Sequence, residues 1–363
     1  MKIAFYGSSL LSSYWNGAAT YYRGLLRALS THGHDITFYE PDVYGRQQKR
    51  DIEPPEWCKV VVYDGTIEAL KRVAADAGSA DIVIKASGVG FEDDLLLNGV
   101  LANSHPKALK IFWDVDAPAT LAELRASPDH PLRHALKTLD LVLTYGGGKP
   151  VIDAYQALGA KECVPIYNAL DPHTHHPVPV EERFKTDLFF LGNRLPDREA
   201  RVDDFFLKAA HALPERSFML GGAGWDDKPF SPNLTYIGHV PTKDHNAFNV
   251  SARAVLNISR DSMAQNGFSP ATRVFEATGA GACLITDHWE GIDYFFKPGE
   301  EILVARDGQD VADLVHDLTA EKAAAIGKRA LSRALADHTY EQRAHTADAL
   351  FKARLARSME AAE

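Results

Sequence analysis

The segment of the sequence that most clearly suggests chemistry runs from Phe268 to Ala277. Ser269 is a preferred residue just before a helix and Pro270 a preferred first helical residue, so the segment predicts a helix that begins here. The free backbone amides and the dipole at such a helix start would suit a diphosphate. Arg273 and Glu276 are three residues apart and share one helix face, where they could contact a ligand or form only a surface ion pair.

Two carboxylates, Asp114 and Asp116, follow the apolar run 109–113. They could form a metal-binding Asp-x-Asp pair, orient or deprotonate a hydroxyl group, or cap a helix that begins near Pro118. We favour the second interpretation, with Asp116 as the principal residue and Asp114 beside it. A metal site is not expected.

Glycine-rich segments offer further candidate sites. The loop from Gly7 to Gly17 lacks the Gly-x-Gly-x-x-Gly pattern, so it does not predict dinucleotide binding. The run 221–224 follows an apolar segment, and its glycines would allow a ligand to approach the backbone closely. The run 146–149 fails as a phosphate loop because Pro150 stands where Ser or Thr belongs. His173, His175 and His176 predict a solvated linker rather than a metal site.

These candidates must be positioned by the elements that the apolar patterns predict. Strands are expected at 2–6, 36–39, 60–63, 82–86, 109–113, 141–144, 163–167, 188–191, 218–220, 234–237, 255–258 and 283–286. Helical patterns separate most of them, and two or three helices follow residue 309. Alternating strands and helices favour parallel pairing, and the interruption at 168–179 favours two doubly wound Rossmann-like domains with a cleft between them.

Composition excludes several classes of protein. The chain has 363 residues and a net charge of −10, which disfavours general nucleic-acid binding and docking on an anionic membrane. No apolar run reaches the roughly 18 residues of a membrane span. Three cysteines without a Cys-x-x-Cys pair indicate buried free thiols, which suit a reducing compartment. We therefore expect a cytoplasmic protein.

Several of these segments resemble one known group of enzymes. Residues 273–281 look like the donor-site region of the GT-B glycosyltransferases, and the closest likeness is to the spore-maturation CgeB-like family, related to the large retaining group 1. Weaker similarities lie at 7–29, 112–118, 170–172, 176–177, 191–193, 196–198, 236–240, 284–286 and 299–302. Each is weak alone, and their common order supports a GT-B architecture of two Rossmann-like domains.

The resemblance implies a division of the chain and a set of donor contacts. It places an N-terminal acceptor-side domain at 1–169, a linker at 170–180, a C-terminal donor-side domain at 181–338, and a terminal helix in 339–363 that packs back towards the N-terminal domain. Glu276 would accept hydrogen bonds from the ribose hydroxyls. The other implied donor contacts are Arg273, Arg198, Arg194, Asn193, Ser269, Thr272 and Gly222. In the loop after the first strand, Asn16 and Gly17 would face the donor phosphates and the acceptor.

The resemblance also implies the activity. We expect a retaining, metal-independent glycosyltransferase that moves a sugar from a nucleoside diphosphate to a hydroxyl on a glycan, protein or small molecule, without a cofactor. Related families often carry a glutamate where this chain has Phe268, which leaves a non-catalytic nucleotide- or glycan-binding module as an alternative. A nucleotide-sugar epimerase of the same fold is the other alternative.

Overall fold

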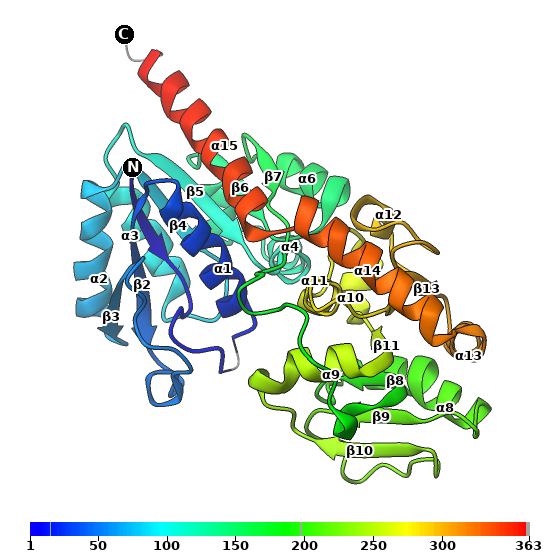
Figure 1. The fold of residues 1–363 in the computed structure, drawn as a ribbon. Helices are drawn as coiled ribbons and strands as arrows, with labels where there is room; N and C mark the ends of the chain where they lie inside the picture. The colour runs from blue at the N-terminus through cyan, green and yellow to red at the C-terminus, as the bar shows by residue number, and fades with distance from the viewer. Residues whose placement is uncertain (15, 197, 361–363) are drawn as a thin grey trace. The chain divides into compact units, whose positions relative to one another are not determined.

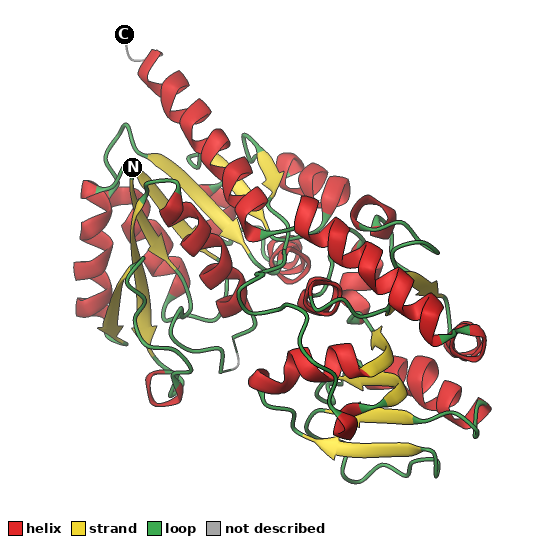
Figure 2. Cartoon of the chain, viewed as in Figure 1, coloured by secondary structure: helices red, strands yellow, loops and turns green. Residues whose placement is uncertain are grey.

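The computed structural model describes residues 1–14, 16–196 and 198–360. The chain divides into two units, of which the first comprises Met1–Tyr167 and the chain from Tyr340 onward. The second unit comprises Asn168–Thr339. Each unit is an α/β layer structure in which helices cover a parallel sheet (Figures 1 and 2).

The first unit contains a seven-stranded parallel sheet in the order β3-β2-β1-β4-β5-β6-β7. Its strands are β1 (Lys2–Tyr6), β2 (Asp35–Asp42), β3 (Lys59–Asp64), β4 (Ile82–Ala86), β5 (Leu109–Asp114), β6 (Leu141–Thr144) and β7 (Cys163–Pro165). The order reverses direction between β1 and β4, and in such sheets ligands bind at the carboxyl ends of the strands near this switch point.

The helices of this unit cover both faces of the sheet. They are α1 (Ala18–Thr31), α2 (Ile67–Ala75), α3 (Asp93–Asn103), α4 (Ala117–Ala126), α5 (Pro131–Ala135), α6 (Gly148–Ala157) and α15 (Tyr340–Glu360). The last of them, α15, packs against α1. His34, directly before β2, interacts with Asp348 of α15 at this contact, with 3.0 Å between Nε2 and Oδ1.

The alternation of side chains along β1 explains why both faces are covered. Phe5 stacks on Phe38 of β2 with ring centroids 5.1 Å apart, and Tyr6 stacks on Tyr39 at 4.5 Å. Because successive side chains of a strand point to opposite faces, these two aromatic pairs anchor two separate apolar layers. Tyr6 belongs to the layer under α2, whereas Phe5 contacts Tyr22 of α1.

The second unit contains a six-stranded parallel sheet in the order β10-β9-β8-β11-β12-β13. Its strands are β8 (Thr186–Leu191), β9 (Phe218–Gly221), β10 (Leu234–Gly238), β11 (Ala252–Asn257), β12 (Leu284–Asp287) and β13 (Leu303–Ala305). Its helices are α7 (Glu199–Val202), α8 (Lys208–Ala212), α9 (His245–Ser251), α10 (Asp261–Asn266), α11 (Thr272–Gly279), α12 (Ile292–Phe295), α13 (Gly308–Asp317) and α14 (Ala320–Asp337). A π-helical turn at Asp203–Leu207 joins α7 to α8.

Every strand that the sequence predicts is present, and the two doubly wound sheets confirm the predicted fold class. The edge strand β13 was missed because its three residues are too few to show a pattern. The three cysteines are buried and free, as expected. In the part of the chain that the structure describes, no helix is both long and apolar enough to span a membrane.

One local expectation was wrong, and a second holds only in part. The helix expected to begin at Pro270 begins at Thr272, so Ser269 is not its cap, and its hydroxyl donates to the carbonyl of Gly267 at 2.9 Å. The segment expected to be a solvated linker is partly packed: His175 is only 7% exposed, and Leu170 bridges to Thr339. Leu170 fills the space beside Gly279, where an added Cβ would lie 2.2 Å from its Cδ1.

Candidate active site

A pocket of about 330 Å³ lies at the carboxyl ends of strands β8, β9 and β11 in the second unit. We refer to it as the C-terminal pocket. Five of the predicted donor residues line it: Asn193, Arg198, Gly222, Thr272 and Arg273. They come from three separate stretches of sequence, which the parallel strands bring together because all carboxyl ends meet at one edge of the sheet.

The charged residues that line the C-terminal pocket are all arginines. Arg198, Arg260 and Arg273 line it, and none of its described lining residues is acidic. Nη1 of Arg273 is buried and has no hydrogen-bond partner among the described residues. Burial lowers the pKa of the Arg273 guanidinium from its ordinary value, and the charge of Glu276 partly opposes this. A buried charged donor without a partner is costly, so this atom is positioned to gain from an anion.

The backbone around the pocket depends on one glycine. Gly222 has a φ of +120°, and a Cβ at this position would lie 2.2 Å from the carbonyl oxygen of Gly192. The two loops are joined further by Asn193, whose Oδ1 accepts from the backbone N–H of Ala223 at 2.9 Å. Trp225 donates its indole N–H to Gly192 at 2.8 Å. Gly222 therefore allows the close approach of two loops, as well as access to the pocket.

His245 is a lining residue that the sequence did not identify. It begins α9, and its Nε2 lies 3.3 Å from the carbonyl oxygen of Val240. Burial, together with the positive charge of Arg273, lowers the pKa of His245 to about 4. The imidazole is therefore neutral at physiological pH. His245 is distinguished by its proximity to Arg273 in three dimensions. No local sequence pattern could have shown this proximity.

A buried polar network fixes Ser259, one of the residues that line the C-terminal pocket. Asp287 at the end of β12 is fully buried and accepts hydrogen bonds from the backbone N–H and the hydroxyl of Ser259, at 3.0 and 3.1 Å. Arg201 pairs with the same carboxylate, with 2.6 Å between Nη2 and Oδ2. Ser259 lines the pocket, so Asp287 fixes a residue that a ligand would meet.

Three predicted donor residues are not among the lining residues. Arg194 pairs with Glu199 and Asp227 at 2.7 and 2.6 Å, so two carboxylates already occupy its guanidinium. Ser269 is buried behind the start of α11. Glu276 lies one turn into α11 and is partly exposed, and no described residue forms a hydrogen bond with its carboxylate. Their proposed contacts with a donor stay predictions.

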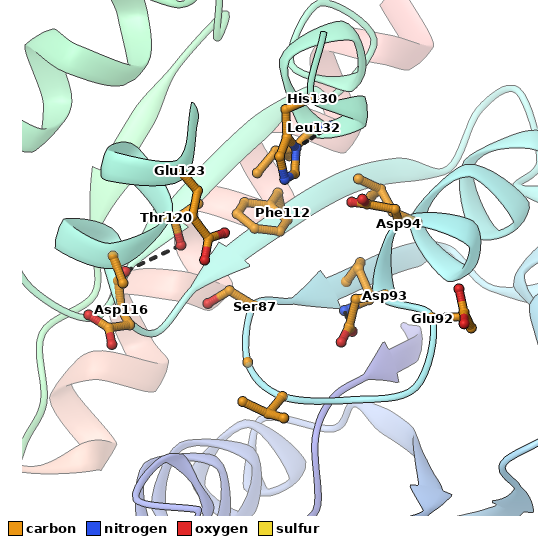
Figure 3. A pocket seen from close by; sticks show the side chains of 15 residues that line it. Ser87, Glu92, Asp93, Asp94, Phe112, Asp116, Thr120, Glu123, His130 and Leu132 are labelled. Carbon is orange, nitrogen blue, oxygen red and sulfur yellow. Dashed lines mark hydrogen bonds and ion pairs between the residues drawn. The ribbon is translucent and has the colours of Figure 1, made fainter. Parts of the chain in front are cut away.

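The first unit has a pocket of its own, which we refer to as the N-terminal pocket. It has a volume of about 440 Å³ and lies at the carboxyl ends of β4 and β5 (Figure 3). Asp116 lines it, is exposed, and stands directly before α4. The interpretation of Asp116 as a side-chain helix cap was not favoured from the sequence, and its carboxylate makes no such bond.

Asp114 has a different environment from Asp116. It is fully buried and accepts hydrogen bonds from Ser87 Oγ at 2.7 Å and from Thr120 Oγ1 and the Asp116 backbone N–H, both at 3.0 Å. Tyr155 donates its hydroxyl to the other carboxylate oxygen. Burial raises the pKa of the Asp114 carboxyl, and the hydrogen bonds oppose this effect. The geometry assigns Asp114 a positioning role, because three of its partners line the N-terminal pocket. Its predicted catalytic role stays untested.

The loop after β1 is also held by internal bonds. Asn16 donates from Nδ2 to the carbonyls of Ser9 and Ser12 at 2.8 and 3.1 Å, and Ser8 donates its hydroxyl to Asn16 Oδ1. Asn16 is therefore a residue that shapes this loop, while Gly17 is exposed at the start of α1. Their contact with a ligand stays a prediction.

Comparisons with known proteins agree with this geometry. Residues 198–349 match the model of a family described as glycosyl transferase-like. No curated protein sequence matches the chain. In the part of the chain that the structure describes, no group of three or more His, Cys, Asp or Glu side chains is placed to hold a metal ion.

Solved structures share the fold over the whole chain. Sucrose-phosphate synthase from Thermosynechococcus elongatus is 14% identical with a TM-score of 0.68, and the match covers 100% of both chains. HepE from Anabaena, solved in complex with UDP and glucose, is 13% identical with a TM-score of 0.66 over 97% of this chain and 100% of that one. The β-glucosyltransferase of T4 phage, solved with UDP-glucose, is 12% identical with a TM-score of 0.55 over 99% of each chain.

The fold and the family match define the class of the protein. Its two parallel-sheet units are those of the GT-B fold. The chain therefore has the GT-B fold, and its residues 198–349 match a glycosyl transferase-like family.

Proposed function

We propose that the C-terminal pocket binds the diphosphate of a UDP-sugar, and that the enzyme transfers the sugar to a hydroxyl of its acceptor. The observation that carries this proposal is the buried, unpartnered Nη1 of Arg273 in a pocket lined by three arginines and no described acidic residue. The structures of HepE and of T4 phage β-glucosyltransferase were solved with UDP or UDP-glucose, which supports UDP as the nucleotide.

The proposed reaction needs charge stabilisation more than covalent catalysis. The bond between the anomeric carbon and the β-phosphate oxygen breaks, the acceptor oxygen bonds to that carbon, and the acceptor proton leaves. The electron pair of the broken bond stays on the β-phosphate oxygen, and UDP is the leaving group. The Arg273 guanidinium and the first backbone N–H groups of α11 would stabilise the departing diphosphate, a task that a divalent cation performs in other enzymes. We therefore propose that no metal is needed.

The acceptor would bind in the first unit, in the N-terminal pocket. Asp116 is the carboxylate placed to orient the acceptor hydroxyl, because it is exposed in that pocket and has no hydrogen-bond partner on its side chain among the described residues. Asp114 would position Asp116 through the backbone N–H at 3.0 Å. Retention at the anomeric carbon, membership of the CgeB-like group and cytoplasmic location follow from the sequence resemblance and the free thiols, and belong to the same proposal.

Thermal stability in the presence of UDP, GDP, dTDP and ADP tests the proposal. At one hundred times its dissociation constant, a ligand stabilises by about 2.7 kcal/mol, which raises the melting temperature by roughly 5 °C or more. We expect the largest shift with UDP. No shift with any nucleotide would overturn the donor site and favour a glycan-binding module.

The variant Arg273→Ala locates the binding site. Loss of hydrogen bonds from a charged donor should weaken UDP binding roughly 10- to 100-fold. Arg306→Ala is the matched control, because the Arg306 side chain is 79% exposed and pairs only with Asp310 on the surface. Unchanged UDP affinity in a folded Arg273→Ala protein would show that the diphosphate binds elsewhere.

A further inference from the structure

The N-terminal pocket has two opposed walls (Figure 3). One wall carries Glu92, Asp93 and Asp94 at the start of α3, and the other carries Asp116, Thr120 and Glu123 of α4. The volume of about 440 Å³ lies within the range of pockets that hold small organic ligands and accommodates one or two sugar rings. The pocket is therefore large enough for a molecule rather than a single ion.

The charge of this pocket is strongly negative. Lys85 balances one carboxylate, since its Nζ lies 2.5 Å from Asp93 Oδ1 and donates to the carbonyl of Ala86 at 2.7 Å. Four further carboxylates remain without a hydrogen bond or ion pair in the part of the chain that the structure describes: Glu92, Asp94, Asp116 and Glu123. Since they stand on opposite walls, their field is spread over the cavity instead of being focused at one point.

Apolar and neutral groups complete the pocket. Phe112, Leu97 and Leu132 are buried and contribute apolar surface. His130 accepts the backbone N–H of Leu132 on its Nδ1 at 3.2 Å, so Nε2 is the ring nitrogen that can meet a ligand. An aromatic side chain among carboxylates suits the apolar face of a sugar ring that also bears a positive charge.

We propose that the acceptor carries a protonated amine beside the hydroxyl that receives the sugar, as an amino sugar does, and that this pocket recognises the amine. The inference rests on the proposed function, in which the N-terminal pocket holds the acceptor. The combined field of the carboxylates on the two walls attracts the ammonium group into the cavity, and Phe112 provides the surface against which the ring packs. Asp116, beside them, orients the reacting hydroxyl.

Direct binding of three sugars tests the proposal without the need for a donor. Glucosamine, glucose and N-acetylglucosamine share one ring, but only glucosamine is cationic near neutral pH. Exposed ion pairs each contribute little, so at low salt we expect glucosamine to bind about fivefold more tightly than the other two. High salt should reduce this difference, because it screens exposed charges. Equal affinities, or undetectable binding of glucosamine, would overturn the proposal.

A double variant shows where the amine binds. Asp94→Asn with Glu123→Gln removes one carboxylate from each wall and should reduce the affinity for glucosamine to that for glucose. Glu68→Gln removes one negative charge from an exposed site on α2, outside the pocket, and should change nothing. If the double variant binds glucosamine as the wild type does, the amine is recognised elsewhere and the proposal fails.

UDP binding, measured in parallel, separates this inference from the proposed function. If the protein binds UDP but shows no preference for glucosamine, only the proposal that the acceptor carries an amine is overturned. Failure to bind UDP would overturn the donor site, while the comparison of the three sugars would still decide whether the N-terminal pocket recognises an amine.

Discussion

The two pockets differ in whether their buried charged side chains have hydrogen-bond partners. In the C-terminal pocket, Arg273 has a buried Nη1 for which no described residue provides an acceptor. Beside the N-terminal pocket, the buried carboxylate of Asp114 accepts hydrogen bonds from four groups, while Asp116 and Glu123, which line the pocket, are exposed. Because a buried charge without partners costs several kcal/mol, the first arrangement favours a ligand of opposite charge and the second favours a rigid wall.

This difference indicates how each pocket would gain its affinity. A desolvated guanidinium forms strong, charge-assisted hydrogen bonds with a diphosphate, and its planar shape fixes the position of the bound oxygens. Exposed carboxylates attract a cation weakly and in a salt-dependent manner. The C-terminal pocket should therefore bind its ligand tightly and the N-terminal pocket loosely, with specificity in the latter set by the fixed positions of its walls.

The largest expected effect concerns Asp114, the buried carboxylate beside the N-terminal pocket. Asp114→Asn replaces one acceptor oxygen by a donor that must face Tyr155 or the hydroxyls of Ser87 and Thr120. Leaving buried polar groups unsatisfied should reduce the free energy of unfolding by about 3 kcal/mol. Urea unfolding followed by circular dichroism measures this, and the affinity for UDP should stay within a factor of two because the change lies in the other unit.

Asp153→Asn is the control for this variant, since Asp153 is 55% exposed and pairs only with Lys149 on the surface of α6. Its effect should be below about 0.5 kcal/mol. If Asp114→Asn reduced the free energy of unfolding by as little as this control, the hydrogen bonds of Asp114 would not stabilise the wall of the pocket. The contrast between the two pockets would then be lost.

The next effect concerns the pH dependence of the C-terminal pocket. The pKa of His245 is about 4 in the folded protein, whereas the ordinary value is 6.5. The unfolded chain therefore binds more protons between these values, and the stability contributed above pH 6.5 is lost as the pH falls towards 4. Because the side chain is partly exposed, we expect a loss of about 2 kcal/mol rather than the full shift.

Urea unfolding at pH 7.0, 5.5 and 4.5 measures this loss, which His245→Asn should reduce and the exposed His211→Asn should not. A bound diphosphate would favour the imidazolium, so UDP should make the loss smaller. Identical pH dependence in the wild type and His245→Asn would contradict the environment assigned to His245.

The sequence predicted the elements better than the contacts. Apolar runs located the strands because most of these parallel strands are buried on both faces. The resemblance named Asn193, Gly222 and Arg273 as donor contacts, and all three line the C-terminal pocket although they lie far apart in the chain. The predicted start of α11 was wrong because Ala271, directly after Pro270, is extended with φ −64° and ψ 153°, so the helix begins only at Thr272.

What the sequence could not show depends on three-dimensional packing. Asp114 and Asp116 are two residues apart and chemically identical, yet one is buried and the other exposed. Their difference arises from Tyr155 on α6, 41 positions from Asp114 in the chain. Likewise, no sequence pattern showed that Glu199 and Asp227 form ion pairs with Arg194, whose contact with a donor stays a prediction.

The smallest expected effect would sharpen the assignment of Glu276. If its carboxylate accepts the ribose hydroxyls, Glu276→Gln should weaken UDP binding about fivefold, because a neutral acceptor replaces a charged one. Binding of 2′,3′-dideoxy-UDP should not change, since that ligand lacks both hydroxyls. Isothermal titration of both nucleotides measures the difference, and Glu215→Gln is an exposed control in the same unit. If Glu276→Gln weakens both ligands equally, Glu276 acts through the charge of Arg273 and does not contact the ribose.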